Sequence, residues 1–384
     1  METGNHIETG ALRYVVFLVA GIGLVSCGTS RPDEAPHPGA GRRVHAGAVW
    51  DDPIRCSEAV RAGSRLNRAQ FRTRIGTWNL NWFPDGQQKD QAWRGTRTNV
   101  GWVACVIAWM DVDLLALQEI KLTERGLLAL DDVLAELKGL TGTAWKRIVD
   151  TCPVPSRQHV AVLYRPDRVT VSQVVNHPEV DPTAVAGAPD PSCPGELRPA
   201  LGMYVESKAG GLDFHFVTTQ LQDGREQKEL TRRRRGWAGL AKVHAQRIAL
   251  RQDEDFVVAA DFSSIGCFRC EAPSQDAEQE ILVSTLRGFD RPLRVLDCSE
   301  GCTRYAHGKP QRSDQIVVSA TMSEARGLSA RAVGVCDAAR CKKLGPNASL
   351  AFSHLSDHCP LIVDLHDRDE DTTAGAATVE ELSP

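Results

Sequence analysis

A carboxylate and an imidazole stand next to each other near the C-terminus, in the segment Ser356-Asp357-His358-Cys359-Pro360. The apolar run that follows, residues 361–363, has the composition of a buried strand. An ionisable pair beside a core strand suits metal-assisted phosphoryl chemistry, which needs a hard oxygen ligand next to a proton donor or acceptor. The alternative is a surface loop in which Asp357 only caps a turn. This segment alone does not decide between the two.

Three other acids also lie beside short apolar runs of the kind that form buried strands. Glu119 and Asp261 each end such a run, and Asp314 precedes one. A further run leads into a polar segment that contains Asn79 and Asn81. Acids that lie beside strands, in a fixed order along one chain, are unlikely to be there by chance.

This order of motifs resembles the endonuclease/exonuclease/phosphatase superfamily, whose deoxyribonuclease-I-like members are metal-dependent phosphodiesterases. The resemblance extends from about residue 74 to residue 365. The matching motifs are Trp78-Asn79, Leu117-Gln118-Glu119, Tyr164-Arg165-Pro166, Arg198-Pro199, Asp261-Phe262 and Ser356-Asp357-His358. The resemblance implies an α+β fold in which a two-layer β-sandwich is flanked by helices, in the four-layer order α/β/β/α. It places the site at one end of the sheets.

The resemblance also implies a metal site. Glu119 would hold Mg²⁺ with Asn79 alongside, and Mn²⁺ and Ca²⁺ are alternative ions. Asp357 matches a residue that is a further ligand in some members. Asn81 stands where some relatives carry a second metal-binding acid, and an amide there should weaken ion binding. Independently of the family, a carboxylate at the end of a buried strand needs a partner, and a cation supplies one.

His358 is the expected acid/base group. By resemblance, Asp314 hydrogen-bonds the far nitrogen of this imidazole and fixes its tautomer. Asp261 would orient or deprotonate the attacking water. A lone histidine is more often a satisfied core side chain, but the motif around His358 reverses that preference. Relatives usually carry Asn two places after this Asp, where this chain has Ser263, a shorter side chain that donates one hydrogen bond.

Two glutamines replace a hydrogen-bonded Glu–His pair of the family. Gln220 occupies the His position, and Gln158, six residues before Tyr164, occupies the Glu position. Amides can bind phosphate oxygens or each other, but they do not transfer protons at pH 7. We therefore expect slow or specialised hydrolysis without a second catalytic histidine. Arg198 is expected to brace a strand and could also reach a phosphate.

Three functional hypotheses follow. The first is an exported, metal-dependent phosphodiesterase of nuclease type, with nucleic acid as the default substrate. The second keeps the enzyme but assigns it a phospholipid or inositol phosphate, although sphingomyelinase-type relatives keep the second histidine. The third is a catalytically degenerate member that binds phosphorylated ligands or a partner protein at the cell surface. Retention of the acids and of His358 argues against the third.

Composition agrees with one large domain in the 384-residue chain. Of its residues 42% are hydrophobic and 24% are charged, which is ordinary for a globular protein. The net charge of −4 argues against a protein whose whole surface binds nucleic acid. We expect a monomeric domain at residues 71–366, a Pro/Gly-rich tether at 27–70 and a disordered acidic tail at 367–384.

Residues 1–26 resemble a lipoprotein signal peptide. Their apolar stretch, 14–25, is too short to span a bilayer and has about the length of a signal-peptide core. The sequence Leu24-Val25-Ser26-Cys27-Gly28 looks like a bacterial lipobox, which implies cleavage before Cys27 and lipidation of its thiol. The domain would then be anchored in the cell envelope. An uncleaved anchor or simple secretion is the alternative, and export from the cytosol is expected in each case.

The twelve cysteines support export, because a cytosolic enzyme seldom needs so many. A zinc site built from Cys267-x-x-Cys270 and Cys298-x-x-x-Cys302 is conceivable, but an oxidising compartment favours disulfides. In deoxyribonuclease-I-like relatives a disulfide joins the corresponding loops, which favours a bond between these two pairs. Cys105 and Cys359 are expected to be buried thiols.

Residues 225–251 are strongly basic, with nine Lys or Arg and two acids. Trp237, Leu240 and Ile248 recur at helical spacing, which predicts an amphipathic helix. Its basic face could give salt-sensitive affinity for nucleic acid. A solvated face, or contact with anionic headgroups, is the favoured alternative.

Overall fold

The computed structural model describes residues 47–86, 97–152, 158–181, 198–345 and 350–370 of the chain. All of them belong to one compact unit, Val44–Pro384. Within these ranges, none of the helices combines the length and the apolar character that a membrane-crossing segment requires.

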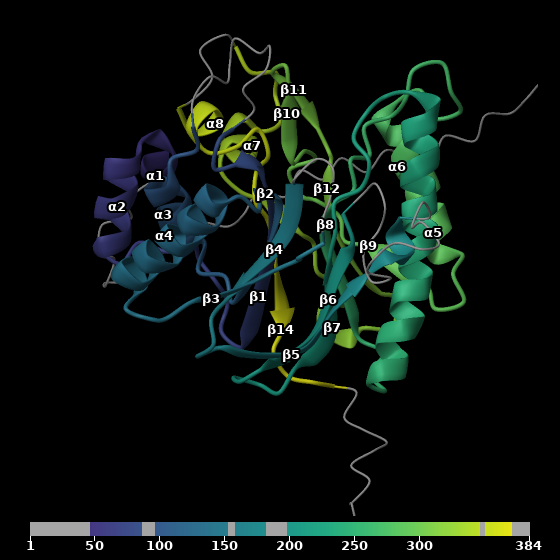
Figure 1. Cartoon of the computed structure of the whole chain (residues 1–384), viewed down its shortest axis with the longest axis horizontal. Coiled ribbons are helices and arrows are strands. Elements are labelled where there is room, and N and C mark those ends of the chain that lie inside the picture. Colours follow the sequence, from purple (N-terminus) through teal and green to yellow (C-terminus); the bar gives the residue numbers. More distant parts are fainter. Residues whose placement is uncertain (1–46, 87–96, 153–157, 182–197, 346–349, 371–384) are drawn as a thin grey trace, which may run out of the picture. The chain divides into compact units, whose positions relative to one another are not determined.

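Two six-stranded sheets form the centre of this unit (Figure 1). The first sheet has the order β13 (Arg331–Ala332), β14 (Leu361–His366), β1 (Arg72–Phe83), β2 (Leu114–Lys121), β4 (Gln158–Tyr164) and β3 (Lys146–Val149). The second sheet has the order β5 (Val169–His177), β6 (Ala200–Ser207), β7 (Asp213–Thr218), β8 (Phe256–Asp261), β12 (Asp314–Ser319) and β9 (Leu293–Val295).

Each sheet contains one parallel pair at its centre, β1–β2 in the first and β7–β8 in the second, among otherwise antiparallel neighbours. A parallel pair needs a crossover connection, and the helices α3 (Val100–Met110) and α5 (Gln227–Leu250) provide the two crossovers. The carboxyl ends of the two strands in each pair therefore lie at the same edge of their sheet. That edge is where polar residues can gather around a ligand.

Helices cover the outer face of each sheet (Figure 1). On the first sheet lie α3, α4 (Glu124–Thr141), α1 (Gly47–Asp51) and α2 (Pro53–Arg61), and on the second lie α5 and α6 (Gln275–Arg287). The remaining elements are the helices α7 (Val335–Ala339) and α8 (Leu350–His354), the 3₁₀ turns η1 (Pro178–Val180) and η2 (Ser323–Ala325), and the hairpin strands β10 (Arg304–Ala306) and β11 (Lys309–Gln311).

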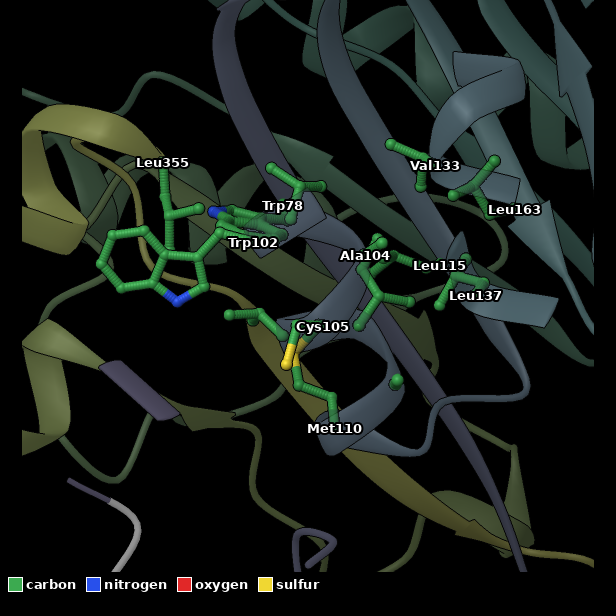
Figure 2. Packing of buried hydrophobic residues seen from close by; sticks show 14 of the residues in the cluster. Trp78, Trp102, Ala104, Cys105, Met110, Leu115, Val133, Leu137, Leu163 and Leu355 are labelled. Carbon is green, nitrogen blue, oxygen red and sulfur yellow. The ribbon is translucent and has the colours of Figure 1, made fainter. Parts of the chain in front are cut away.

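Three hydrophobic clusters separate these layers. The central one joins inward residues of both sheets, such as Ile75 of β1 and Phe214 of β7. A second lies between the first sheet and its helices, where Figure 2 shows Trp78 of β1 and Trp102 of α3 among its members. A third packs Trp237 of α5 against the second sheet. The expected four-layer α/β/β/α sandwich is confirmed.

The expectation of a tether up to residue 70 is wrong from residue 47 onward. Helices α1 and α2 lie in this range, with Val49 and Cys56 fully buried in the outer cluster. The start of α2 has a helix-capping signal in its sequence: Asp52 is followed by Pro53 at the first helical position, and its carboxylate accepts hydrogen bonds from two backbone amides. Residues 27–46 lie outside the described ranges.

The acidic tail also begins later than expected. Asp367 is buried, and its carbonyl oxygen accepts a hydrogen bond of 3.0 Å from the backbone amide of Leu212. Arg368 forms an isolated bridge with Gly211. Residues 367–370 are thus part of the fold, and residues 371–384 lie outside the described ranges.

The disulfides differ from those expected. The bonded pairs are Cys56–Cys105, Cys267–Cys270, Cys302–Cys341 and Cys336–Cys359, while Cys298 is a buried free thiol. The proposed link between the 267/270 and 298/302 pairs is therefore wrong, as are the buried thiols at 105 and 359. Because Cys267, Cys270 and Cys302 are all in disulfides, the conceivable zinc site is also removed. Cys152 is disulfide-bonded as well, and Cys193 lies outside the described ranges.

The basic segment forms the amphipathic helix α5, but part of its charge faces inward. Arg233 is fully buried and makes a two-pronged ion pair with Glu278 of α6. The same guanidinium donates hydrogen bonds to the carbonyl oxygens of Gln222 and Gly224. Arg233 therefore braces the loop between β7 and α5 instead of contributing to a basic outer face.

Candidate active site

Asn79 joins the two sheets at the edge where their parallel strands end. Its amide nitrogen lies 3.0 Å from the carboxylate oxygen Oε1 of Glu119 on β2. The same nitrogen lies 2.9 Å from Oδ2 of Asp261 on β8. Asn79 is fully buried and Asp261 nearly so. Residues 182 positions apart in sequence thus form one hydrogen-bonded group because both strands end at the same place.

Local irregularities of β1 and β2 aim these side chains. The pairing of β1 with β2 shifts register between Asn79 and Phe83, and the pairing of β2 with β4 shifts between Leu117 and Ile120. Within the shifts, Asn81, Trp82 and Glu119 have positive φ values of 48°, 59° and 62°. Bulges of this kind redirect side chains and are common beside active sites.

Asn81 contributes to the site through its backbone. Its amide nitrogen donates a 2.8 Å hydrogen bond to the side-chain oxygen of Asn79, which fixes the orientation of that amide. The next amide, that of Trp82, donates to Oε2 of Glu119 at 3.1 Å. The turn after Asn79 thus supports the expected metal ligands, and a ligand role for the Asn81 side chain stays a prediction.

Gln158 and Gln220 both converge on Glu119. The Gln158 amide nitrogen lies 2.9 Å from Oε2, and that of Gln220 lies 2.8 Å from Oε1. Together with Asn79 and the Trp82 amide, they give this carboxylate four hydrogen-bond donors. The two amides therefore act as neutral donors to the expected metal ligand and do not form a pair with each other.

Arg198 stands behind Gln158. Its guanidinium donates to the side-chain oxygen of Gln158, and among the described residues no carboxylate lies within ion-pair distance of it. Burial lowers the pKa of the Arg198 guanidinium more than the nearby charges of Glu119 and Asp261 raise it. A buried cation whose contact is a neutral amide has capacity left for an anion.

His358 is paired with Asp314 as expected. Its Nδ1 lies 2.9 Å and 3.2 Å from the two carboxylate oxygens of Asp314, and both residues are buried. This contact occupies Nδ1, so Nε2 is the nitrogen left for a substrate or a water. The nearest carboxylate oxygen to Nε2 belongs to Asp357, at 3.8 Å.

The turn that carries His358 is fixed to β1. Ser356 Oγ donates a 2.6 Å hydrogen bond to the carbonyl oxygen of Asn79 and accepts one of 3.0 Å from the backbone amide of His358. The indole nitrogen of Trp78 donates to the His358 carbonyl oxygen at 3.1 Å. Ser356 and Trp78 therefore link the acid/base residue to the strand that carries the expected metal ligand.

Ser263 holds Asp261 in place. Its backbone amide and its hydroxyl both donate to Oδ1 of Asp261, at 2.8 Å and 3.1 Å. Burial raises the pKa of the Asp261 carboxyl, and the charge of Asp314, its partner in the neighbouring strand, raises it further. A carboxylate with a raised pKa is better suited to accept a proton. In this arrangement Ser263 orients that carboxylate.

The donor set fits a hard divalent cation. Glu119 offers carboxylate oxygens, and Mg²⁺ is commonly held by one or two carboxylates together with waters and substrate phosphates. Asn79 presents its amide nitrogen to Glu119, while its side-chain oxygen accepts the hydrogen bond from the Asn81 amide. Asp261, Asp314 and His358 also place ligand atoms within 4.8 Å of one another. Asp314 and His358, however, already bond each other through Nδ1, so we assign them to proton transfer. Asp357 lies beside His358, with one oxygen turned to Arg304.

Arg304 is a site residue that the motifs did not reveal. Its Nε donates to Asp357 Oδ2 at 3.2 Å, and its Nη1 lies 3.6 Å from Asp223. Burial lowers the pKa of the guanidinium, but the charges of Asp223 and Asp261 outweigh burial, and the pKa is raised. No local pattern in the sequence indicated that Arg304 faces this site.

Comparison with known proteins identifies similar structures but no similar sequences. The sequence matches no protein-family profile and no curated protein. The human Nocturnin catalytic domain superposes with a TM-score of 0.48 and 16% identity, covering 79% of this chain and 97% of that one. An endonuclease/exonuclease/phosphatase family protein from Bacteroides thetaiotaomicron gives 0.49 and 16%, covering 77% and 97%. A mannosyl-6-phosphatase from the same bacterium gives 0.49 and 18%, covering 76% and 99%.

Likeness at this level concerns the arrangement of strands and helices, so the chemistry must be argued from the site itself. The site combines a carboxylate with four donors, a carboxylate with a raised pKa, and an imidazole oriented by an acid. A buried guanidinium lies beside Gln158 and a largely buried one beside Asp357. This set can bind a cation, polarise a water and hold an anionic group.

Proposed function

We propose that the chain is a metal-dependent phosphoesterase of the endonuclease/exonuclease/phosphatase superfamily. The observation that carries the proposal is the buried His358–Asp314 pair, 2.9 Å apart, beside Asp261, whose pKa is raised. A structural histidine does not need an orienting acid, a second acid facing it and a free Nε2. General acid/base chemistry needs all three.

Glu119 and Asn79 would hold the cation, for which Mg²⁺ is the best candidate and Mn²⁺ or Ca²⁺ the alternatives. When bound, the ion supplies a Lewis acid that polarises a phosphoryl oxygen. Gln158 and Gln220 would then release Glu119 or turn their oxygen atoms toward the ion, since an amide side chain can present either atom. Asp357 and Asn81 stay candidate further ligands.

His358 and Asp261 would perform the proton transfers. Asp261, oriented by Ser263, would position a water and accept its proton. Asp314 keeps Nδ1 of His358 occupied, so Nε2 is the atom that would give a proton to the leaving oxygen. Because neither Gln158 nor Gln220 can share this task, substrates with stable leaving groups are favoured. Arg198 supplies positive charge to the phosphate on the Gln158 side.

The proposed substrate is a phosphodiester, with nucleic acid first and a phospholipid or inositol phosphate second. The proposed location is outside the cytosol, with a lipid anchor at Cys27. The four disulfides among the described residues support an oxidising compartment.

The test uses the full chain with plasmid DNA and bis(p-nitrophenyl) phosphate, in Mg²⁺, Mn²⁺, Ca²⁺ or EDTA. We expect metal-dependent cleavage that His358→Ala reduces by about 10²–10⁴-fold, the usual contribution of a general acid or base. Glu119→Gln should raise the metal requirement. His354→Ala is the matched control, because the hydrogen bonds of the His354 ring to the described residues go to Ser353 and Leu350 of its own helix. Equal activity of parent and His358→Ala in every ion would contradict the proposal.

A second candidate, a non-catalytic binding protein, rests on one observation. The Glu119 carboxylate already has four donors in the protein itself, so it is satisfied without an ion. Titration calorimetry with Mg²⁺ separates the two candidates. Heat of binding that Glu119→Gln diminishes supports the enzyme, and its absence together with absent turnover supports the binding protein.

A further inference from the structure

We propose that Arg304 binds the phosphate group of the substrate on the His358 side of the site. This inference deepens the proposed function and rests on it for the identity of the ligand. No motif in the sequence assigns Arg304 a role. Three features of Arg304 support this role: its place beside His358, its contacts and the charge around it.

The hairpin of β10 and β11 brings Arg304 to the site. Arg304 forms an isolated antiparallel bridge with His358, and the backbone amide of Tyr305 donates to the Asp357 carbonyl oxygen at 2.8 Å. The preceding residue, Thr303, accepts hydrogen bonds from the amides of Ser313 and Asp314. The position of Arg304 is therefore fixed by the same backbone that fixes His358 and Asp314.

The guanidinium of Arg304 makes one close contact and one loose contact. Nε donates to Asp357 at 3.2 Å, and both of these side chains are largely buried. Nη1 lies 3.6 Å from Asp223, which exceeds an ordinary hydrogen bond, and the Asp223 side chain is 53% exposed. A guanidinium has five N–H donors in a planar fork, so this pair of contacts leaves donors for a third partner.

The charges of the site require a cation at this point. Asp314, Asp357 and Asp223 all lie on the His358 side, and a phosphate that approaches Nε2 would meet their negative charge. Arg198 lies on the other side, behind Gln158. Arg304 offsets the repulsion where the phosphate and His358 meet. The fork geometry of a guanidinium also matches two phosphate oxygens.

Asp223 is the group that the phosphate would displace. It lies on the loop that Arg233 braces through the carbonyl oxygens of Gln222 and Gly224. The backbone there is held, while the Asp223 carboxylate is exposed and only loosely joined to Arg304. Exchange of this carboxylate for a phosphate keeps the Arg304–Asp357 contact intact.

The test measures binding of inorganic phosphate to the full chain by titration calorimetry, in Mg²⁺ and in EDTA. We expect Arg304→Gln to weaken phosphate binding by about 10- to 100-fold, the usual effect of losing a hydrogen bond to a charged group. Arg304→Lys should recover part of the affinity, since it keeps the charge without the fork. Lys309→Gln is the matched control: it removes the same charge from an exposed position of the same hairpin and should leave affinity unchanged.

Asp223→Asn distinguishes phosphate binding from a bracing role. If the two anions compete for Arg304, removing the charge of Asp223 should strengthen phosphate binding several-fold. An arginine that only braces Asp357 predicts no gain. Unchanged phosphate affinity in Arg304→Gln, in a variant with the parent's circular dichroism and melting temperature, would overturn the proposal.

Turnover is measured separately, so that the two proposals fail in different ways. Turnover without any Arg304 dependence of phosphate affinity or KM refutes this inference and leaves the phosphoesterase in place. If phosphate binding depends on Arg304 but the protein shows no turnover, the result supports this inference and refutes the proposed phosphoesterase activity.

Discussion

Glu119 shows how two glutamines act together. At the two positions where the superfamily that the sequence resembles has a Glu–His pair, Gln158 and Gln220 place two neutral donors on this carboxylate, at 2.9 Å and 2.8 Å. The carboxylate therefore has a structural role in the protein without metal. In this respect Glu119 differs from a catalytic acid whose charge only repels the groups around it.

Removal of this acceptor should destabilise the protein. We expect Glu119→Ala to lower the free energy of unfolding in EDTA by about 2–4 kcal/mol, because buried donors lose a charged partner. Urea denaturation measures the change, and Glu58→Ala, at an exposed position of α2, is the control. Equal or greater stability of Glu119→Ala would show that the acid is strained in the resting site.

The sequence identified residues of this site whose position follows from the end of a strand. Glu119, Asp261 and Asp314 lie beside apolar runs, so the topology alone brings them to one edge. Arg304 has no such constraint. Its direction depends on a three-residue hairpin strand and on a backbone bridge to a residue 54 positions later, which no local pattern encodes.

Among the elements, the short helices and the disulfides were the hardest to predict. Helices α1 and α7 have only five residues each, too few for a hydrophobic period to be visible. Disulfide pairing depends on distances between loops, so cysteine spacing leaves many connectivities open. The structure attaches α7 to the Asp357–His358 turn through Cys336–Cys359, next to the acid/base residue.

Loss of this disulfide should affect both stability and turnover. The bond closes 23 residues, and we expect Cys336→Ser with Cys359→Ser to cost about 3 kcal/mol and to lower kcat, because the turn holding His358 loses its anchor. The comparison is Cys56→Ser with Cys105→Ser, which opens a bond far along the chain from that turn. It should cost about 4 kcal/mol and leave kcat of the folded protein unchanged. Equal effects of both double variants on kcat would contradict the anchoring role.

At the scale of the whole molecule, the four layers were predictable because the order of the strand-end motifs resembles one superfamily. Composition alone indicated only a sizeable globular domain. The limits of that domain were misjudged at both ends, since Pro-rich and acidic residues near each boundary concealed short segments that pack on the core. Boundaries depend on such contacts more than on local composition.

The helix layer on the second sheet should make the protein sensitive to acid. His244 of α5 is buried and stacks on Phe256, and burial, followed by the charge of Arg291, lowers its pKa to about 4. In the unfolded chain the pKa of His244 is near 6.5, so between pH 6.5 and 4 the unfolded chain binds more protons than the folded one. The stability that neutral His244 contributes is therefore fully present above pH 6.5 and is lost as the pH falls toward 4.

We expect the titration of His244 to lower the free energy of unfolding by about 1–2 kcal/mol when the pH falls from 7 to 5. Urea denaturation at both values measures this difference, and His244→Gln should reduce it. The comparison uses the pH dependence of each protein and not its absolute stability, since the variant also loses the ring contact with Phe256. The same pH dependence in both proteins would contradict this assignment.

Asn79 connects two halves that each contain a parallel pair and its crossover helix. A chain in which only one sheet had formed would hold Glu119 or Asp261, but not the amide contact between them. Ligand affinity would therefore report on the docking of the two sheets, and a bound ion or phosphate would stabilise the contact between the two sheets. Saturating ligand should then slow the separation of the halves, so that resistance to proteolysis rises throughout the molecule and not only near the site.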